Sequence, residues 1–336
     1  MEVVYSRGLW ISVGDLWLDP LSIQPFAFVS HAHTDHLRGH QVVLASPPTA
    51  ALSRQRLGER GRTRYEVLEF GREVWLGDLR PDQPRGDLRL KLLPAGHVLG
   101  SAMLRAEGER GSVLYTGDFK LREGMTAERC QPERADTLVM ETTYGIPRYA
   151  MPPAEEVRKQ IVIFCREALA AGDTPVFLAY ALGKAQELMA ILGAAGLPLA
   201  LHRSVAAIAA VYERSGKALP AYCHHVGGCP DGHVLICPPG AAGLEGILRK
   251  RTAVVSGWAM DRWATYRYGC DAAFALSDHA DYPDLLRMVE LVGPKKVRTV
   301  QGVAVECATD LRARGIEAWA LGRENQLEMQ GIVAGL

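Results

Sequence analysis

A dense group of metal-binding side chains lies near the start of the 336-residue chain, in the segment SHAHTDH at positions 30–36. The apolar run at positions 26–29 directly precedes it and predicts a strand. In an extended segment, residues two apart point to the same side, so His31 and His33 can share one metal ion. Three imidazoles and one carboxylate within six residues therefore predict a metal site at a strand end.

Other predicted strands also end in residues that can bind metal. His97 follows the strand predicted at 88–93, Asp118 follows 112–115, and His279 follows 272–276. Nitrogen and oxygen donors without cysteine suit two neighbouring divalent ions better than one structural zinc ion. A carboxylate can bridge two ions through its two oxygens, and Asp118 is the natural candidate. The predicted ligands are His31, His33, Asp35, His36, His97, Asp118 and His279.

Composition excludes several classes of protein. Hydrophobic residues make up 48% of the chain and charged residues 23%, which is ordinary for a globular protein. No apolar run reaches membrane-spanning length, and the first residues lack the features of a signal peptide, so we expect a cytoplasmic protein without a membrane. The seven cysteines are scattered, which indicates reduced thiols. The histidine pair between Cys223 and Cys229 fits no zinc module well.

The pattern of predicted elements changes along the chain. Up to about residue 149, short strands alternate with turns, and Thr34 is a reasonable N-cap for a helix after the histidine segment. From about residue 150, helices alternate with strands, which predicts a parallel sheet. Beyond about residue 252 the chain returns to strands with polar ends. The strongest predictions of the middle region are helices at 154–171, 183–192 and 205–215, with strands at 174–179, 199–201 and 234–237.

The motifs together resemble those of a known fold. Residues 31–36 resemble the HxHxDH signature of the metallo-β-lactamase fold, and Asp19, His97 and Asp118 resemble its other motif positions. Glu141 and His279 resemble motifs A and B of the β-CASP branch, which cuts nucleic acids. The resemblance implies an α/β architecture: an αββα sandwich formed by residues 1–149 and 253–336, with a Rossmann-like β-CASP cap inserted at 150–252.

The resemblance also implies roles for individual residues. His31, His33, His97 and Asp118 would hold one metal ion, and Asp35, His36, Asp118 and His279 the other. Asp19 would orient ligands, although it could simply cap a turn. Glu141 would hydrogen-bond His279 or help to deliver the leaving-group proton, although it could be a helix-capping partner. Two divalent ions are implied, Zn²⁺ first, with Mn²⁺ or Mg²⁺ as alternatives. The residues expected to carry catalysis are Asp35, Asp118, Glu141 and His279.

Within that branch the chain looks most like bacterial ligase-associated DNA exonucleases. We therefore expect a phosphodiesterase that cuts DNA in repair through a metal-activated water, with a DNA ligase or helicase as a partner. The alternative is a ribonuclease of the mRNA 3′-end-processing type. RNA-cutting members carry a histidine at motif C, where this chain has Gln301. Gln301 can hydrogen-bond a phosphate oxygen but cannot act as an acid, and this favours DNA.

Further residues are candidates for contacts with the substrate, although each could be structural instead: Tyr144, Lys184, Ser256, Ser277 and Gln301. Trp258 and Trp263 could stack on bases or pack within the protein. A small-molecule metallohydrolase is a third class of function, which the β-CASP-like insert disfavours. A non-catalytic scaffold is a fourth, which the seven filled ligand positions disfavour.

Overall fold

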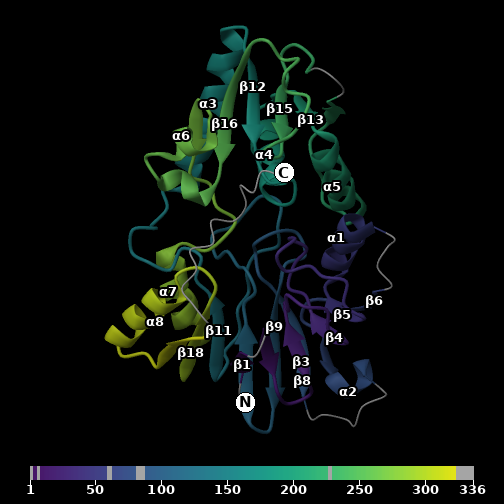
Figure 1. Cartoon of the computed structure of the whole chain (residues 1–336), viewed down its shortest axis with the longest axis vertical. Coiled ribbons are helices and arrows are strands. Elements are labelled where there is room, and N and C mark those ends of the chain that lie inside the picture. The colour runs from purple at the N-terminus through teal and green to yellow at the C-terminus, as the bar shows by residue number, and fades with distance from the viewer. Residues whose placement is uncertain (1–2, 6–7, 59–62, 81–87, 226–228, 323–336) are drawn as a thin grey trace. The chain divides into compact units, whose positions relative to one another are not determined.

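A computed structural model describes residues 3–5, 8–58, 63–80, 88–225 and 229–322. The described chain divides into two compact units (Figure 1). The first unit comprises the residues up to Tyr149 together with those from His279 onward. The second comprises Ala150–Asp278 and is inserted into the first. The chain is a mixed α/β protein, as the sequence predicts.

The first sheet of the first unit has six strands in sequence order. They are β1 (Val3–Tyr5), β2 (Leu9–Ile11), β3 (Leu16–Leu18), β4 (Phe26–Phe28), β5 (Val42–Ala45) and β6 (Arg64–Val67). The strands from β3 to β6 run parallel to one another. All three residues of β4 are buried, so this strand is apolar throughout, and it ends just before the histidine segment.

The second sheet of the first unit has seven strands, in the order β19-β18-β11-β10-β9-β8-β7. These are β7 (Glu73–Trp75), β8 (Arg89–Pro94), β9 (Ala102–Gly108), β10 (Gly111–Tyr115), β11 (Thr137–Glu141), β18 (Lys296–Val300) and β19 (Ala318–Ala320). The strands β10, β11, β18 and β19 run parallel to one another. Their carboxyl ends therefore lie along one edge, to which β10 brings Asp118 and β11 brings Glu141.

The two sheets pack face to face with helices outside. A core between the sheets joins Phe28 and Leu44 of the first sheet to Leu90 and Leu104 of the second. A second core lies on the outer face of the second sheet, where α7 (Tyr282–Val292) and α8 (Ala304–Ala313) cover it. The short α2 (Leu76–Leu79) follows β7, and α1 (Pro47–Leu57) packs through Leu57 beside the first sheet. This is the predicted αββα arrangement.

The second unit is built around one parallel sheet, in the order β14-β13-β15-β12-β16-β17. Its elements are α3 (Ala154–Ala170), β12 (Thr174–Leu178), α4 (Lys184–Ala194), β13 (Leu199–Leu201), α5 (Arg203–Arg214), β14 (Tyr222–His224), β15 (Val234–Cys237), β16 (Lys250–Val255), the 3₁₀ helix η2 (Gly257–Met260), α6 (Ala264–Tyr268) and β17 (Ala272–Phe274). Parallel strands must be joined by crossovers, and alternating helices supply them, as the sequence predicts.

Two expectations differ from the structure. The helix predicted after Thr34 is wrong, because residues 34–36 form only a turn. There the Arg38 guanidinium donates to the carbonyl oxygens of Thr34 and Leu37, which a helix would use for its own bonds. The second domain boundary also lies elsewhere. Residues 253–278 belong to the second unit, since β16 pairs with both β12 and β17 in its sheet.

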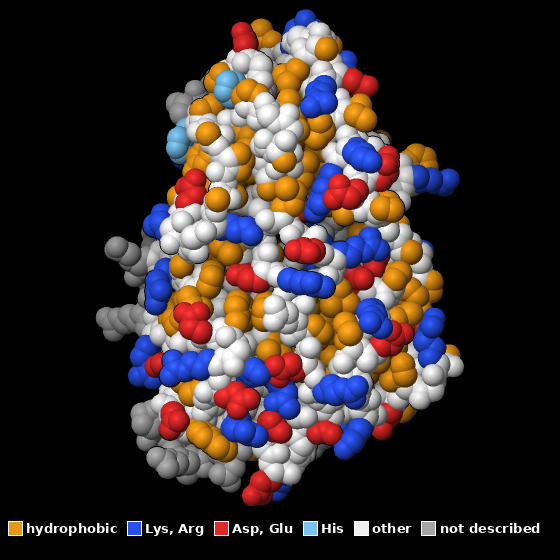
Figure 2. All heavy atoms as spheres, turned by 180° about the vertical axis from the view of Figure 1, so that it is seen from behind, with side chains coloured by type: hydrophobic (Ala, Val, Ile, Leu, Met, Phe, Trp, Pro, Cys, Tyr) orange, Lys and Arg blue, Asp and Glu red, His pale blue; other side chains and the backbone are white. Residues whose placement is uncertain are grey.

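The surface carries both signs of charge. On the face seen in Figure 2, basic and acidic side chains lie interspersed, in keeping with the net charge of zero. None of the helices in the described ranges has the length and apolar character needed to cross a membrane.

Candidate metal centre

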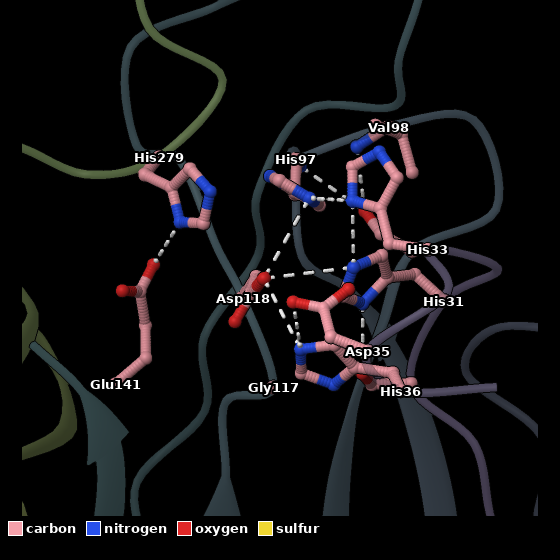
Figure 3. A network of polar contacts seen from close by, with 12 residues as sticks. His31, His33, Asp35, His36, His97, Val98, Gly117, Asp118, Glu141 and His279 are labelled. Carbon is pink, nitrogen blue, oxygen red and sulfur yellow. Dashed lines mark hydrogen bonds and ion pairs between the residues drawn. The ribbon is translucent and has the colours of Figure 1, made fainter. Parts of the chain in front are cut away.

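Four side chains from three separate segments converge in the first unit (Figure 3). His31 and His33 follow β4, His97 lies in the loop after β8, and Asp118 lies after β10. Their donor atoms all lie within 4.8 Å of one another. The Nδ1 atom of His33 is 2.9 Å from Nε2 of His31 and 3.0 Å from Nε2 of His97. Three imidazoles and a carboxylate thus face one small volume.

Asp118 is the centre of a wider arrangement. Its Oδ2 atom lies 3.5 Å from His31 Nε2, 3.4 Å from His36 Nε2 and 3.8 Å from His97 Nε2. Its other oxygen, Oδ1, is buried without a hydrogen-bond partner. The loop that carries it approaches Ser30 so closely that a Cβ on Gly117 would lie 2.5 Å from the Ser30 Cβ. Only glycine fits there, so the backbone itself sets the position of Asp118.

His36 joins this arrangement with Asp19 behind it. The Nδ1 atom of His36 is 2.9 Å from Asp19 Oδ2, which directs its Nε2 toward Asp118. Asp35 lies further out: its Oδ2 is 3.8 Å from His36 Nε2, and its side chain is 41% exposed. A carboxylate on one imidazole nitrogen fixes the tautomer at the other, and Asp19 occupies that position on His36.

His279 completes the group from the far end of the chain. Its ring centroid is 4.6 Å from that of His97, and it forms a donor group with Asp118 and Glu141. Its Nδ1 is 3.0 Å from Oε1 of Glu141, which also accepts from the Phe119 amide at 3.3 Å. The other oxygen of Glu141 accepts from the Thr143 amide at 3.0 Å. Glu141 is therefore a fixed, buried carboxylate that holds the His279 ring.

Burial and mutual charge shift the protonation of these groups. Burial, followed by repulsion from His36 and His97, holds the pKa of His31 well below its usual value. Burial also lowers the pKa of His36, but attraction to Asp118 and Asp19 outweighs it, and the net shift is well upward. Burial raises the pKa of Asp118, yet attraction to His36 and His279 outweighs it and holds that pKa well below the usual value.

The residues present fit divalent cations. Imidazole and carboxylate donors without thiolate suit borderline and hard ions. The Oδ1 atom of Asp118 is buried and accepts no hydrogen bond, and a bound cation would satisfy this oxygen. His31 is held neutral, which is the form that ligates. Burying Asp118 together with His31, His36 and His97 is costly unless positive charge is supplied among them.

The predicted substrate contacts divide between the two units. Tyr144 is buried in the first unit, with its ring 6.1 Å from that of His279. Gln301 is exposed in the same unit and adopts a left-handed backbone with φ of 59°. In the second unit, the Lys184 ammonium is buried and paired with Asp278, Ser256 caps η2, and Ser277 is buried. The paired Lys184 is therefore not a free surface cation.

Two residues of the site were missed by sequence reasoning. Ser30 donates to Asp19 through its amide at 2.7 Å and through its hydroxyl at 2.6 Å. Tyr115 is fully buried, and its hydroxyl donates to the same carboxylate at 2.8 Å. Both stand at strand ends beside recognised motif residues, and that position is the signal that could have found them. They tie Asp19, and through it His36, to both sheets.

Comparison with known proteins agrees with this site. Residues 26–156 match the model of the metallo-beta-lactamase superfamily. A "Probable DNA ligase" from Opitutus terrae is 47% identical over 333 residues, covering 98% of this chain and 32% of that protein. The "5' exonuclease Apollo" of Danio rerio is 31% identical over 165 residues, covering 47% of this chain and 28% of that protein. The chain thus spans about a third of the length of these curated relatives.

A solved structure shows the same fold over most of the chain. A protein of unknown function from Enterococcus faecalis V583 superposes with a TM-score of 0.58 at 14% identity, covering 89% of this chain and 79% of that one. At that identity the likeness concerns the fold alone. The family match covers residues 26–156, the part of the chain that contributes His31, His33, His97 and Asp118 to the donor group.

Proposed function

We propose that this protein is a metal-dependent nuclease that hydrolyses phosphodiester bonds, with DNA as its substrate. The observation that carries the proposal is the position of Asp118 between the donor group of His31, His33 and His97 and the donor group of Glu141 and His279. One oxygen of Asp118 faces histidines and the other is unpartnered, which suits a carboxylate shared by two ions. The proposed ligands are the seven predicted ones.

Bound divalent ions would supply an activated water and would stabilise the charge that develops on the attacking and leaving oxygens. The chain's own residues hold the donors in place. Asp19 fixes His36 from behind, and Glu141 does the same for His279, so each ring presents one chosen nitrogen. The side chain of Asp35 is 41% exposed, so we infer that solvent and substrate reach the donor set from its side. We propose zinc as the metal, because imidazoles dominate the donor set.

Two features favour DNA. A relative at 47% identity bears the name probable DNA ligase, and this chain corresponds to about a third of it. Domains joined in one protein commonly act on one substrate, so we infer that the present chain prepares DNA ends for a ligase. Gln301 follows Val300, the last residue of β18 and the register partner of Glu141, and offers an amide in place of an acid. We further propose that Ala150–Asp278 is a β-CASP insertion, and that the protein acts in the cytoplasm, where its thiols stay reduced.

Product analysis tests the proposal. The full chain, stripped of metal with a chelator and then reconstituted separately with Zn²⁺, Mn²⁺ or Mg²⁺, is incubated with DNA and RNA oligonucleotides of matched sequence. Each oligonucleotide carries a label at its 5′ or its 3′ end. We expect metal-dependent shortening of DNA that is faster than that of RNA, and none after chelation. Faster cleavage of RNA would show that RNA, not DNA, is the preferred substrate. Intact DNA and RNA with every metal would refute the nuclease proposal.

A further inference from the structure

The crossover between β16 and β17 in the second unit carries exposed aromatic and arginine side chains together. Trp263 is 59% exposed and Tyr266 is 86% exposed. The guanidinium of Arg262 lies over the Trp263 ring, 5.1 Å from its centroid. Neither the Trp263 indole nitrogen nor the Tyr266 hydroxyl has a hydrogen-bond partner in the part of the chain that the structure describes. We call Arg262, Trp263 and Tyr266 the aromatic platform.

The platform stands on a firmly held backbone. One oxygen of Asp261 accepts from the Trp263 amide at 2.9 Å, and the other accepts from the Arg267 guanidinium at 2.6 Å. Ala264 faces inward and is buried, while α6 ends at Gly269, whose φ is +59°. Positions 263 and 266 are three apart on this helical turn, so the two rings lie on one side of it. The two exposed rings therefore belong to an ordered segment of the backbone.

The platform also lies at the edge of the sheet where parallel α/β folds bind ligands. In such sheets ligands sit beyond the carboxyl ends of the strands. Strand β16 ends at Val255, and the chain passes directly through η2 into α6 (Figure 1). The neighbouring strand β12 ends just before Tyr180, another exposed aromatic residue, whose ring lies 5.7 Å from the Lys184 ammonium. Two adjacent strands therefore lead to exposed aromatic residues, and of the two neighbouring cations Lys184 is buried and paired with Asp278.

The chemistry of the platform favours nucleic acid over protein. Every base has a flat face that can stack on an indole or phenol ring, and a guanidinium can neutralise a phosphate or stack as well. Between residues 261 and 267 one carboxylate, Asp261, interacts with two guanidinium groups, those of Arg262 and Arg267, so the segment carries a net positive charge. Trp, Tyr and Arg also occur at protein interfaces, but there they are set in a contiguous apolar surface. The exposed residues from 261 to 267 include no Leu, Ile, Val or Met.

We propose that the aromatic platform binds unstacked bases of single-stranded nucleic acid, an inference that rests on the proposed nuclease function. Trp263 and Tyr266 supply the stacking faces, and Arg262 contacts the backbone phosphate. Double-stranded nucleic acid keeps its bases stacked on one another and cannot use these faces. Through the platform, the second unit would therefore give the protein a preference for a frayed or single-stranded substrate.

Binding without cleavage provides the test. The full chain is titrated in chelator with a fluorescent single strand of 20 thymidines, and the dissociation constant is read by anisotropy. We expect Trp263→Ala and Tyr266→Ala each to weaken binding by about tenfold, and the double variant by more. Trp263→Phe should keep most of the affinity, because it retains a stacking face. A blunt duplex of the same length should bind more weakly to the wild type and lose little in either variant.

The first unit offers a matched control. Trp319 is 55% exposed, and the Arg312 guanidinium lies over its ring at 4.6 Å, so its surroundings resemble those of Trp263. Trp319→Ala should leave thymidine binding unchanged. Equal affinities for wild type, Trp263→Ala and Tyr266→Ala would overturn the proposal, as would a wild type that binds no single strand. Loss of binding to a DNA ligase with unchanged thymidine binding would overturn it too, in favour of a protein partner.

The outcome separates this proposal from the nuclease assignment. Wild-type protein that binds the single strand through the platform but cleaves nothing with metal restored leaves the platform in place and removes the nuclease function. Protein that cleaves normally while the platform variants bind and cut like the wild type removes the platform alone.

Discussion

The two units place polar and aromatic residues at strand ends in the same way but surround them differently. In the first unit, His31, Asp118 and Glu141 follow buried strands and are themselves almost fully buried. In the second unit, the crossover after β16 carries Trp263 and Tyr266 into solvent. Burial strengthens the interactions between charged groups and holds the side chains in place, which suits a catalytic site. Exposure leaves the faces of the aromatic rings accessible, which suits substrate binding.

The comparison teaches that strand topology sets where a site can be, while burial sets what it can do. The proposed division assigns catalysis to the first unit and substrate binding to the second, and the following predictions can contradict it. If the division is right, substitutions in the first unit change turnover while those in the second change affinity or stability.

The largest effect is expected at the shared carboxylate. Asp118→Asn keeps the size of the side chain but removes the charge that faces three histidines. We expect cleavage to fall on the order of 10³-fold or more, because metal-based stabilisation is worth several kcal/mol. Bound metal, measured by elemental analysis, should fall with it, while circular dichroism stays native. His33→Ala should behave likewise. Wild-type cleavage rates in either variant would remove the metal centre from the mechanism.

The next effect concerns stability in the second unit. Lys184→Met removes the cation from a buried pair and leaves the Asp278 carboxylate buried without it. The expected loss in free energy of unfolding is about 3–5 kcal/mol, measured by urea denaturation. Lys295 forms a matched pair on the surface, 2.8 Å from Asp136 with its side chain 83% exposed. Lys295→Met should cost no more than about 1 kcal/mol. Equal losses in the two variants would show that the Lys184 pair is not effectively buried.

A smaller effect on turnover is expected at Glu141. Glu141→Gln keeps the shape of the side chain but removes its charge and one of its two accepting oxygens. In the wild type these two oxygens contact the Phe119 amide, the Thr143 amide and His279. We expect metal affinity or cleavage to fall by about 10–100-fold, as for other residues that orient a ligand. The double variant with His279→Ala should lose little beyond His279→Ala alone, because Glu141 acts through that ring. Additive losses would contradict this role.

The smallest effect depends on pH. Hydrogen bonding from Lys295, and then from the Ser112 amide and hydroxyl, lowers the pKa of Asp136 to about 2. A carboxyl whose pKa is depressed on folding stabilises the protein above its unfolded value, near 3.8, and loses that contribution as the pH falls toward 2. Wild type and Asp136→Asn should therefore differ in denaturation midpoint at pH 6 and converge near pH 2. A difference that grows on acidification would reverse the sign and refute the assignment.

Much of the fold and the donor set could be predicted from sequence, because the signals are local. Apolar runs such as 26–29 and 137–140 are followed at once by polar residues, among them His31 and Glu141. The helix wrongly predicted after Thr34 shows the limit. The Thr34 carbonyl accepts from the Arg38 side chain, a local side-chain contact that helix propensity does not contain. Likewise Tyr115 donates to Asp19 across 96 positions, and only the packed sheets bring the two together.

The interruption of the first unit by the second has a consequence for biosynthesis. Tyr149 and Tyr282 flank the insert and are joined by a backbone hydrogen bond of 3.1 Å, while His279 is the first residue after the insert. The ribosome therefore releases His31 to Asp118 early and His279 only after roughly 160 further residues, an interval of about 10–30 s. A nascent chain holds an incomplete donor set throughout that time. The donor set is complete only once the whole insert has been made, so we expect a truncated translation product to lack the complete metal centre.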